Sequence, residues 1–232
     1  MLCYDKLIPI SMSTQIAFIF DMDGVLVDNL EFHVTAWLEF CADKNIPLNR
    51  EEFFQNLNGK NAQDTMNYFF KREVEPELAH ALNEEKEVIY RSIYLPHIKP
   101  ANGLVELLES LKAKGVKLAV GTSAPPANVD FTLDNAGIRH YFDEIVDASM
   151  VKNGKPAPDI YLKAAEKLGV PIEHCVVAED AMQGIQAGLS AGMKVIGITT
   201  SHTAEELAHT HLQAPDFTTI SYDTLVELLG VE

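Results

Sequence analysis

Four short apolar runs occur along the chain, and each has five or six residues. They are largely apolar throughout rather than alternating with polar residues, and they contain β-branched or aromatic side chains. This pattern predicts strands that are buried on both faces, as in a parallel sheet covered by helices. The predicted strands cover residues 15–20, 116–121, 174–178 and 194–198.

Segments with apolar residues at helical spacing alternate with these runs in the second half of the chain. Gly115 and Gly169 directly follow two of the segments, as expected at helix C-termini. Alternation of strand and helix is typical of an open parallel α/β sheet. The predicted helices cover residues 104–114, 158–168, 181–191 and 224–229.

The stretch from residue 29 to residue 97 has a different pattern. Its apolar residues recur at helical spacing over long segments, and none of these segments has the pattern of a strand. Asn49 followed by Glu52 fits a capping box at the start of one helix. The predicted helices cover residues 30–44, 51–57, 62–71 and 76–94.

This helical insertion divides the chain into two predicted domains. The chain returns to the α/β pattern through a proline-containing segment, residues 97–103. We therefore expect an α/β core formed by residues 1–28 and 98–232, and a helical domain formed by residues 29–97. The residues before the first strand lack the basic head and apolar stretch of a signal peptide, so we expect a short tail there, with Met12 as an alternative start.

Composition and charge narrow the classes of function. The 47% of hydrophobic residues is typical of a globular protein, which excludes disordered and fibrous classes. The 34 acidic residues exceed the 18 Lys and Arg residues, and the formal net charge of −16 repels nucleic acid and anionic membrane surfaces. No apolar run approaches the length of a membrane span.

The cysteines and histidines favour a protein without a zinc site. Cys3, Cys41 and Cys175 are widely spaced and form no CxxC pair, which indicates a reducing compartment, so we expect a cytoplasmic protein. Cys41 and Cys175 lie in apolar patterns and are expected to be buried, whereas Cys3 in the tail is expected to be exposed. The segment 201–212 is predicted to be loop and helix away from the first strand. Its histidines are therefore interpreted as surface residues: His202, His209 and His211.

Polar residues occur where three of the predicted strands end. Because the carboxyl ends of parallel strands lie at the same edge of the sheet, we expect these side chains to converge there. Four carboxylates at one edge need a cation, and oxygen ligands without His or Cys suit Mg²⁺ better than zinc. Taken singly, each acidic residue is better explained by a structural role such as a helix cap, and only their joint placement favours a site. The residues are Asp21, Asp23, Thr122, Ser123, Glu179 and Asp180.

Four motifs in this order resemble those of the haloacid dehalogenase-like (HAD) superfamily of phosphotransferases. They are the segment DMDGVLVD at residues 21–28, Thr122 after VKLAVG, Lys155 in KPAPD, and the Glu179–Asp180 pair in AEDAMQGIQAG. The resemblance extends from Gln15 to the C-terminus. It implies a Rossmann-like open parallel sheet with helices on both faces, and a small all-helical cap domain inserted after the first strand.

The resemblance also implies a role for each motif residue. Asp21 would be the nucleophile that forms an aspartyl phosphate, and Asp23 would be the general acid and then the general base. Thr122, the backbone amide of Ser123, and Lys155 would bind the phosphoryl oxygens. Taken alone, Lys155 would be interpreted as a solvated loop lysine. The implied Mg²⁺ ligands are Asp21, Asp23 through its backbone carbonyl, Asp180, and Glu179 directly or through water.

The helical insertion resembles the cap of the β-phosphoglucomutase-like branch of this superfamily. His33 lies where that branch has a hinge histidine, Trp37 also matches, and Lys86 aligns with a lysine that contacts substrate. From the residues alone, His33 is explained equally well as a packing or surface histidine. Lys86 has acidic neighbours on both sides, which favours a solvated charged face.

One cap loop departs from the mutase pattern. Mutases carry an arginine there that binds the second phosphate of a bisphosphate intermediate, whereas Ala62 takes its approximate place in the loop 58–63. A guanidinium binds phosphate through two parallel hydrogen bonds, and alanine cannot replace it. A mutase would have to use Lys60, or Lys71 and Arg72, so hydrolysis is favoured.

These observations predict a Mg²⁺-dependent phosphatase that acts on a small phosphorylated metabolite, most readily a sugar phosphate. The alternative is a sugar phosphomutase of the β-phosphoglucomutase type, which shares the core residues. Dehalogenases and phosphonatases fit less well because those relatives lack an aspartate at the position of Asp23. A binding protein without activity also fits less well, because every core residue type is present. We expect no nucleic-acid or membrane partner, and a monomer or weak homodimer.

Overall fold

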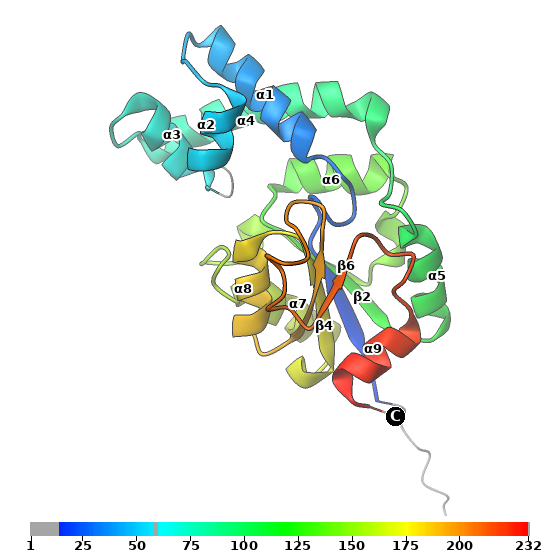
Figure 1. The fold of residues 1–232 in the computed structure, drawn as a ribbon. Coiled ribbons are helices and arrows are strands. Elements are labelled where there is room, and N and C mark those ends of the chain that lie inside the picture. Colours follow the sequence, from blue (N-terminus) through cyan, green and yellow to red (C-terminus); the bar gives the residue numbers. More distant parts are fainter. Residues whose placement is uncertain (1–13, 58–59, 232) are drawn as a thin grey trace, which may run out of the picture.

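The computed structural model describes residues 14–57 and 60–231. Its core is a six-stranded parallel sheet with the strand order β3-β2-β1-β4-β5-β6 (Figure 1). This sheet and its covering helices confirm the predicted open α/β fold. The strands are β1 (Ala17–Phe20), β2 (Lys117–Gly121), β3 (Glu144–Val146), β4 (Cys175–Glu179), β5 (Lys194–Ile198) and β6 (Leu212–Ala214).

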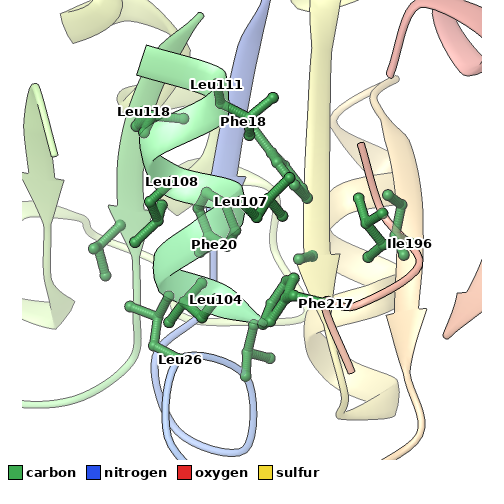
Figure 2. Close-up of a cluster of buried hydrophobic side chains, with 14 of the residues drawn as sticks. Phe18, Phe20, Leu26, Leu104, Leu107, Leu108, Leu111, Leu118, Ile196 and Phe217 are labelled. Atoms are coloured by element: carbon green, nitrogen blue, oxygen red, sulfur yellow. The ribbon is translucent and has the colours of Figure 1, made fainter. Parts of the chain in front are cut away.

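Helices cover both faces of the sheet because successive strand residues point to opposite sides. Phe18 and Phe20 of β1 pack on one side in a cluster that contains the leucines of α5, as Figure 2 shows. Ala17 and Ile19 pack on the other side in a cluster with residues of α7 and α8. The helices of this core are α5 (Leu104–Ala113), α6 (Pro126–Asn135), α7 (Asp159–Leu168), α8 (Met182–Ser190) and α9 (Tyr222–Leu229).

Three elements of the core were not predicted from the sequence. β3 and β6 lie at the two edges of the sheet and have three residues each. Three residues are too few to show a hydrophobic pattern. α6 opens with proline and carries several polar residues. The prediction of a helix within residues 201–212 is wrong, because that segment forms turns and leads into β6. Short 3₁₀ helices complete the chain: η1 (Leu95–His97), η2 (Arg139–Tyr141), η3 (Ala148–Met150) and η4 (Ile172–His174).

Four helices lie between β1 and α5, at the upper left of Figure 1, and they have an apolar cluster of their own. Val34, Trp37 and Phe53 belong to this cluster. A separate cluster is what an independent domain needs, and the boundaries at residues 29 and 97 stay a prediction. The helices are α1 (Leu30–Asp43), α2 (Arg50–Asn56), α3 (Ala62–Phe70) and α4 (Pro76–Tyr94).

The start of α2 confirms half of the predicted capping box. The side chain of Asn49 accepts a hydrogen bond from the backbone N–H of Glu52. The carboxylate of Glu52 accepts a hydrogen bond from the hydroxyl of Tyr68 on α3, at 2.8 Å. This second bond joins α2 to α3.

Cys41 and Cys175 are buried, as predicted. The expectations for the N-terminal tail, including Cys3 and the start at Met12, fall outside the described residues, as do positions 58 and 59 of the cap loop. Within residues 14–57 and 60–231, no helix combines the length and the apolar character that crossing a bilayer requires.

Candidate active site

The three neighbouring central strands end at the same edge of the sheet, and each brings a polar residue there. The register pairs Phe20 of β1 with Val120 of β2 and with Ala178 of β4. Asp21 and Glu179 directly follow the paired positions of β1 and β4, and Thr122 comes two residues after Val120 of β2. The backbone N–H of Asp21 donates to the carbonyl oxygen of Ala178 at 3.0 Å, which fixes this register beyond the strand itself.

Three buried carboxylates form one cluster at this edge. Oxygen atoms of Asp21, Glu179 and Asp180 lie within 4.8 Å of one another. Burial and the charge of Glu179 raise the pKa of Asp180 to about 7. Burial also raises the pKa of Asp21 well above its ordinary value, against the attraction of Lys155. Oxygen-only donors that repel one another in a buried site suit a hard divalent cation, so these residues fit Mg²⁺.

Lys155 lies against two of these carboxylates. Its Nζ is 2.5 Å from Oδ1 of Asp21 and 2.6 Å from Oε1 of Glu179, and its side chain is only 8% exposed. The interpretation of Lys155 as a solvated loop lysine is therefore wrong. Burial alone would lower the pKa of Lys155, but the two carboxylates outweigh it and the pKa rises.

Glu179 is held by hydrogen bonds to both of its oxygens. Oε1 also accepts from the hydroxyl of Tyr161 at 2.7 Å, and Oε2 accepts from the backbone N–H groups of Asp180 and Ala181 at 3.0 and 3.1 Å. A Cβ at Gly184 would lie 1.6 Å from Oε1 of Glu179. The carboxylate thus orients Lys155, and its service as a metal ligand stays a prediction.

The turn after β1 presents Asp23 to the same cavity. Gly24 has a φ of 76°, and a Cβ there would lie 2.1 Å from Oδ2 of Asp180. Only glycine fits such a position without strain. The turn is closed by a bridge between Asp23 and Val27, so the two aspartates of the first motif leave the strand in a defined geometry.

Asn29 connects Asp23 to the cap, and the sequence analysis did not identify it. Its Nδ2 donates to Oδ1 of Asp23 at 2.6 Å and to the hydroxyl of Tyr90 on α4 at 2.7 Å. Its Oδ1 accepts from the backbone N–H of Gly24 at 3.2 Å. Burial raises the pKa of Asp23 to about 6, although the hydrogen bond from Asn29 opposes the shift. The sequence signals only its place between the first motif and the predicted helix 30–44, because its burial follows from the fold.

Thr122 and Ser123 form the turn after β2, and both line the cavity. Thr122 is buried, and its Oγ1 accepts from the backbone N–H of Ala124 at 3.1 Å. Its own N–H donates to the carbonyl of Val146 at the end of β3. Strand pairing and a local turn therefore fix the position of this loop.

The cavity measures about 760 Å³ and is lined by residues of both the core and the helical insertion. His33 and Trp37 of α1 lie against Lys86 of α4 in its wall, with Nζ of Lys86 3.3 Å from Nδ1 of His33. The ring of His33 stacks on Tyr90 at 3.8 Å, and its Nε2 lies 4.0 Å from Oδ1 of Asp23. Burial and the charge of Lys86 lower the pKa of His33 well below its usual value. His33 is thus a packed residue of the cavity wall rather than a surface histidine.

Lys86 is buried, with only 3% of its surface exposed, so the interpretation as a solvated charged face is wrong. Its Nζ donates to Oε1 of Glu87 at 2.6 Å and lies 4.8 Å from the centre of the Trp37 ring. The acidic neighbours that indicated a surface include its own buried partner.

The loop before α3 contributes Lys60 and Ala62 to the cavity wall. Lys71 and Arg72 are exposed at the other end of α3 and do not belong to that wall. Of the cations considered for a second phosphate, the described cavity therefore contains Lys60.

Ser201 lies at the site, contrary to the expectation for its segment. Its Oγ donates to Oδ2 of Asp180, because β5 is the neighbour of β4 and ends at the same edge. The histidines downstream are separate: His209 and His211 are exposed, as predicted. In the parts of the chain that the structure describes, the only His, Cys, Asp or Glu group close enough to hold a metal is the Asp21–Glu179–Asp180 cluster.

A parallel sheet that places these motif residues beneath inserted helices defines a haloacid dehalogenase-like hydrolase. The family model described as Haloacid dehalogenase-like hydrolase matches residues 18–198, and the chain belongs to this family. Its sequence is 36% identical over 180 residues to the fructose-1-phosphate phosphatase of Escherichia coli strain K12, which covers 78% of this chain and 94% of that one. It is 32% identical over 190 residues to the β-phosphoglucomutase of Bacillus subtilis strain 168, covering 78% and 82%.

A solved structure agrees with this assignment. The HAD hydrolase, family IA, variant 3, from Entamoeba histolytica is 35% identical in sequence and superposes with a TM-score of 0.87. The match covers 93% of this chain and all of that one. The predicted superfamily, fold class and hydrolase activity are confirmed.

Proposed function

We propose that this enzyme is a Mg²⁺-dependent phosphatase that hydrolyses a small sugar phosphate through an aspartyl phosphate on Asp21. One observation carries the proposal. The carboxylate of Asp21 contacts the ammonium of Lys155 and lies beside the carboxylates of Glu179 and Asp180, in a cavity lined by the core and by the cap helices. A nucleophilic carboxylate beside a cation and a metal-ligand cluster suits phosphoryl transfer.

The chain's own ligands for the metal would be the Asp21 carboxylate, the Asp23 backbone carbonyl and Asp180. Glu179 would contribute directly or through water. When bound, Mg²⁺ would neutralise the charge that develops on the phosphoryl oxygens. Ser201 keeps Asp180 oriented toward this cluster.

In the first step, an Oδ of Asp21 attacks phosphorus and the ester P–O bond breaks. The bonding electrons go to the leaving oxygen of the sugar, which takes a proton from the carboxyl of Asp23. Thr122, the backbone amide of Ser123, and Lys155 bind the phosphoryl oxygens during the transfer. The alcohol then leaves the cavity.

In the second step, water attacks the phosphorus of the aspartyl phosphate. The carboxylate of Asp23 accepts the proton of this water, and the bond between phosphorus and the Asp21 oxygen breaks. Inorganic phosphate leaves, and both aspartates return to their starting states.

The cap supports hydrolysis over mutase activity. Ala62 offers no side-chain donor for a second phosphate, and the charge of Lys86 is already offset by Glu87, which suits contact with a neutral hydroxyl better than with a phosphate. Lys60 is the remaining cation of the described cap side of the cavity. A mutase must hold both phosphates of a bisphosphate intermediate, which this charge distribution suits poorly.

The cavity chemistry also supports a carbohydrate substrate. Asn83 and Gln183 line it and offer hydrogen bonds to hydroxyl groups, and Oγ1 of Thr65 can accept one. The similar protein of Escherichia coli is named for fructose 1-phosphate, a compound of this class. A cytoplasmic location and a monomeric or weakly dimeric state are proposed with this function.

The test is phosphate release from a panel of sugar phosphates and other small phosphomonoesters. Release should require Mg²⁺, stop with EDTA, and be lost in Asp21→Asn, whose fold is checked by circular dichroism. β-Glucose 1-phosphate is followed in parallel for conversion to glucose 6-phosphate. Conversion without net phosphate release would establish the mutase instead, and full turnover by Asp21→Asn would exclude the aspartyl phosphate.

A further inference from the structure

Glu87 of the cap helix α4 uses one carboxylate oxygen toward its own helix and the other toward the core helix α6. Oε1 accepts from Nζ of Lys86 at 2.6 Å, and Oε2 accepts from Nδ2 of Asn128 at 2.8 Å. Glu87 is 6% exposed and Asn128 is 2% exposed. A buried carboxylate with two donors from two different parts of the fold is held in one orientation.

Asn128 is in turn held by Arg91. The Nη1 of Arg91 donates to Oδ1 of Asn128 at 2.6 Å, and Nη2 donates to Glu84. The amide of Asn128 therefore uses its oxygen toward Arg91 and its nitrogen toward Glu87. The orientation of the amide follows from these two partners, because a flipped amide would lose both bonds.

This network is continuous with the cavity. Asn128 lies in the first turn of α6, six positions after Thr122, so the same loop and helix carry the phosphate-binding turn and the contact to Glu87. Lys86 lies on the other side of Glu87, beside His33 at 3.3 Å and over the ring of Trp37. The position of its ammonium is thereby fixed relative to the core as well as to the cap.

Stability alone does not explain the arrangement. Removing two charges from water costs about as much free energy as their attraction returns, so buried ion pairs add little net stability. The Lys86–Glu87 pair lies beside a ligand cavity, so it is better explained by the fixed position that it gives to the Lys86 ammonium.

We propose that Glu87 and Asn128 are positioning residues that form a cap–core clasp. The clasp holds the ammonium of Lys86 at a set place relative to the Thr122 turn, where it contacts the substrate. The inference rests on the proposed phosphatase function for its substrate, and on the contacts above for its geometry.

The main test is a double-mutant cycle in kcat/KM, measured with the best substrate of the panel. Glu87→Gln should lower kcat/KM about tenfold, mainly through KM, because the amide presents an oxygen to only one of the two donors, Lys86 and Asn128, and the ion pair with Lys86 is lost. In a Lys86→Met background, the same change should cost less than twofold. An equal loss in both backgrounds would overturn the proposal, since a merely structural role does not depend on Lys86.

Asn128→Asp is the second variant, and it tests the clasp from the core side. The substitution keeps an oxygen for Arg91 and removes the amide N–H that donates to Glu87. It should reproduce the loss of Glu87→Gln, again only when Lys86 is present. Glu85→Gln is the matched control: it makes the same change on the same helix, but Glu85 is exposed and pairs with Lys44. It should leave kcat/KM within twofold of the wild type.

Hydrogen exchange of the ligand-free protein separates this proposal from the proposed function. Asn128→Asp should speed amide exchange in both α4 and α6, whereas Glu85→Gln should do so in neither. If no phosphomonoester is hydrolysed by the wild type, the function fails while this readout still decides whether the clasp exists. Unchanged exchange in α4 and α6 of Asn128→Asp would overturn it.

Discussion

Lys155 shows how a single side chain changes the character of the site. It is the cation in direct contact with the carboxylates of Asp21 and Glu179, and it lies 5.0 Å from the centre of the Tyr161 ring. Without it, the described acidic cluster would have to rely on a bound metal alone for neutralisation. Lys155 therefore offsets buried negative charge, and under the proposed function it also binds the phosphoryl group.

Replacing Lys155 with methionine should lower kcat by at least about 100-fold, as removal of one preorganised donor does in other enzymes. The metal-free variant should also unfold at a lower temperature than the wild type, because its carboxylates then repel one another. Phosphate-release assays and thermal unfolding with EDTA would measure both effects. Lys152→Met, which removes an exposed lysine of the same loop, serves as the control. Wild-type kcat in Lys155→Met would contradict the assigned role.

Residues with a motif or a strand end beside them could be predicted, and residues that act through partners could not. Asp21 and Asp180 stand where a buried run ends, so the sequence places them at one edge. Asn29 and Tyr161 belong to no such pattern, and their hydrogen bonds exist only once distant segments meet. Lys86 was misinterpreted because local charge density indicates exposure, whereas its burial follows from the packing of α4 against α1, whose His33 and Trp37 lie beside its ammonium.

Among the elements, the central strands and the cap helices agree with their predicted ranges within one or two residues. The edge strands β3 and β6 could not be predicted, because three residues carry too little pattern and their position depends on pairing with β2 and β5. α8 shows a different dependence on packing. It lies so close to β4 that Gly184 faces the carboxylate of Glu179 without room for a side chain.

Gly184→Ala should therefore be destabilising, although alanine favours a helix over glycine by about 1 kcal/mol. The added Cβ must push Glu179 or α8 aside, which should also displace Lys155 and reduce kcat. Urea unfolding and phosphate release would show a joint loss of stability and activity. Gln186→Ala, at an exposed position of the same helix, should behave like the wild type. A Gly184→Ala enzyme as stable and active as the wild type would mean that α8 can shift freely.

At the level of the whole molecule, the net charge of −16 surrounds a cavity whose floor is itself acidic. The summed field attracts divalent cations and opposes anionic substrates. Under the proposed function, binding of an anionic substrate would therefore depend on local cations and bound metal more than on long-range attraction. The overall charge was evident from the sequence, but its consequence for the site required the fold.

Mg²⁺ should raise the unfolding temperature, because a ligand that binds only the folded state stabilises it by an amount that grows with its concentration. Millimolar MgCl₂ should raise the unfolding temperature more than KCl does at matched ionic strength. The KCl effect measures general screening of the net charge. In Asp180→Asn, the excess of MgCl₂ over KCl should shrink or vanish. Equal stabilisation by the two salts in the wild type would argue against a specific metal site.

The amide of Asn29 has a consequence for how the two parts of the molecule influence each other. It donates both to Asp23 in the core and to Tyr90 in the cap, so the two orientations are thermodynamically linked. Linkage is reciprocal, so docking of the cap stabilises the ordered position of Asp23 by the same free energy by which an ordered Asp23 stabilises the docked cap. A compound that fills the cavity and draws the cap onto the core would therefore also order the proton donor. Selectivity for the bound molecule and the orientation of Asp23 for proton transfer would then both depend on one equilibrium, the docking of the cap onto the core.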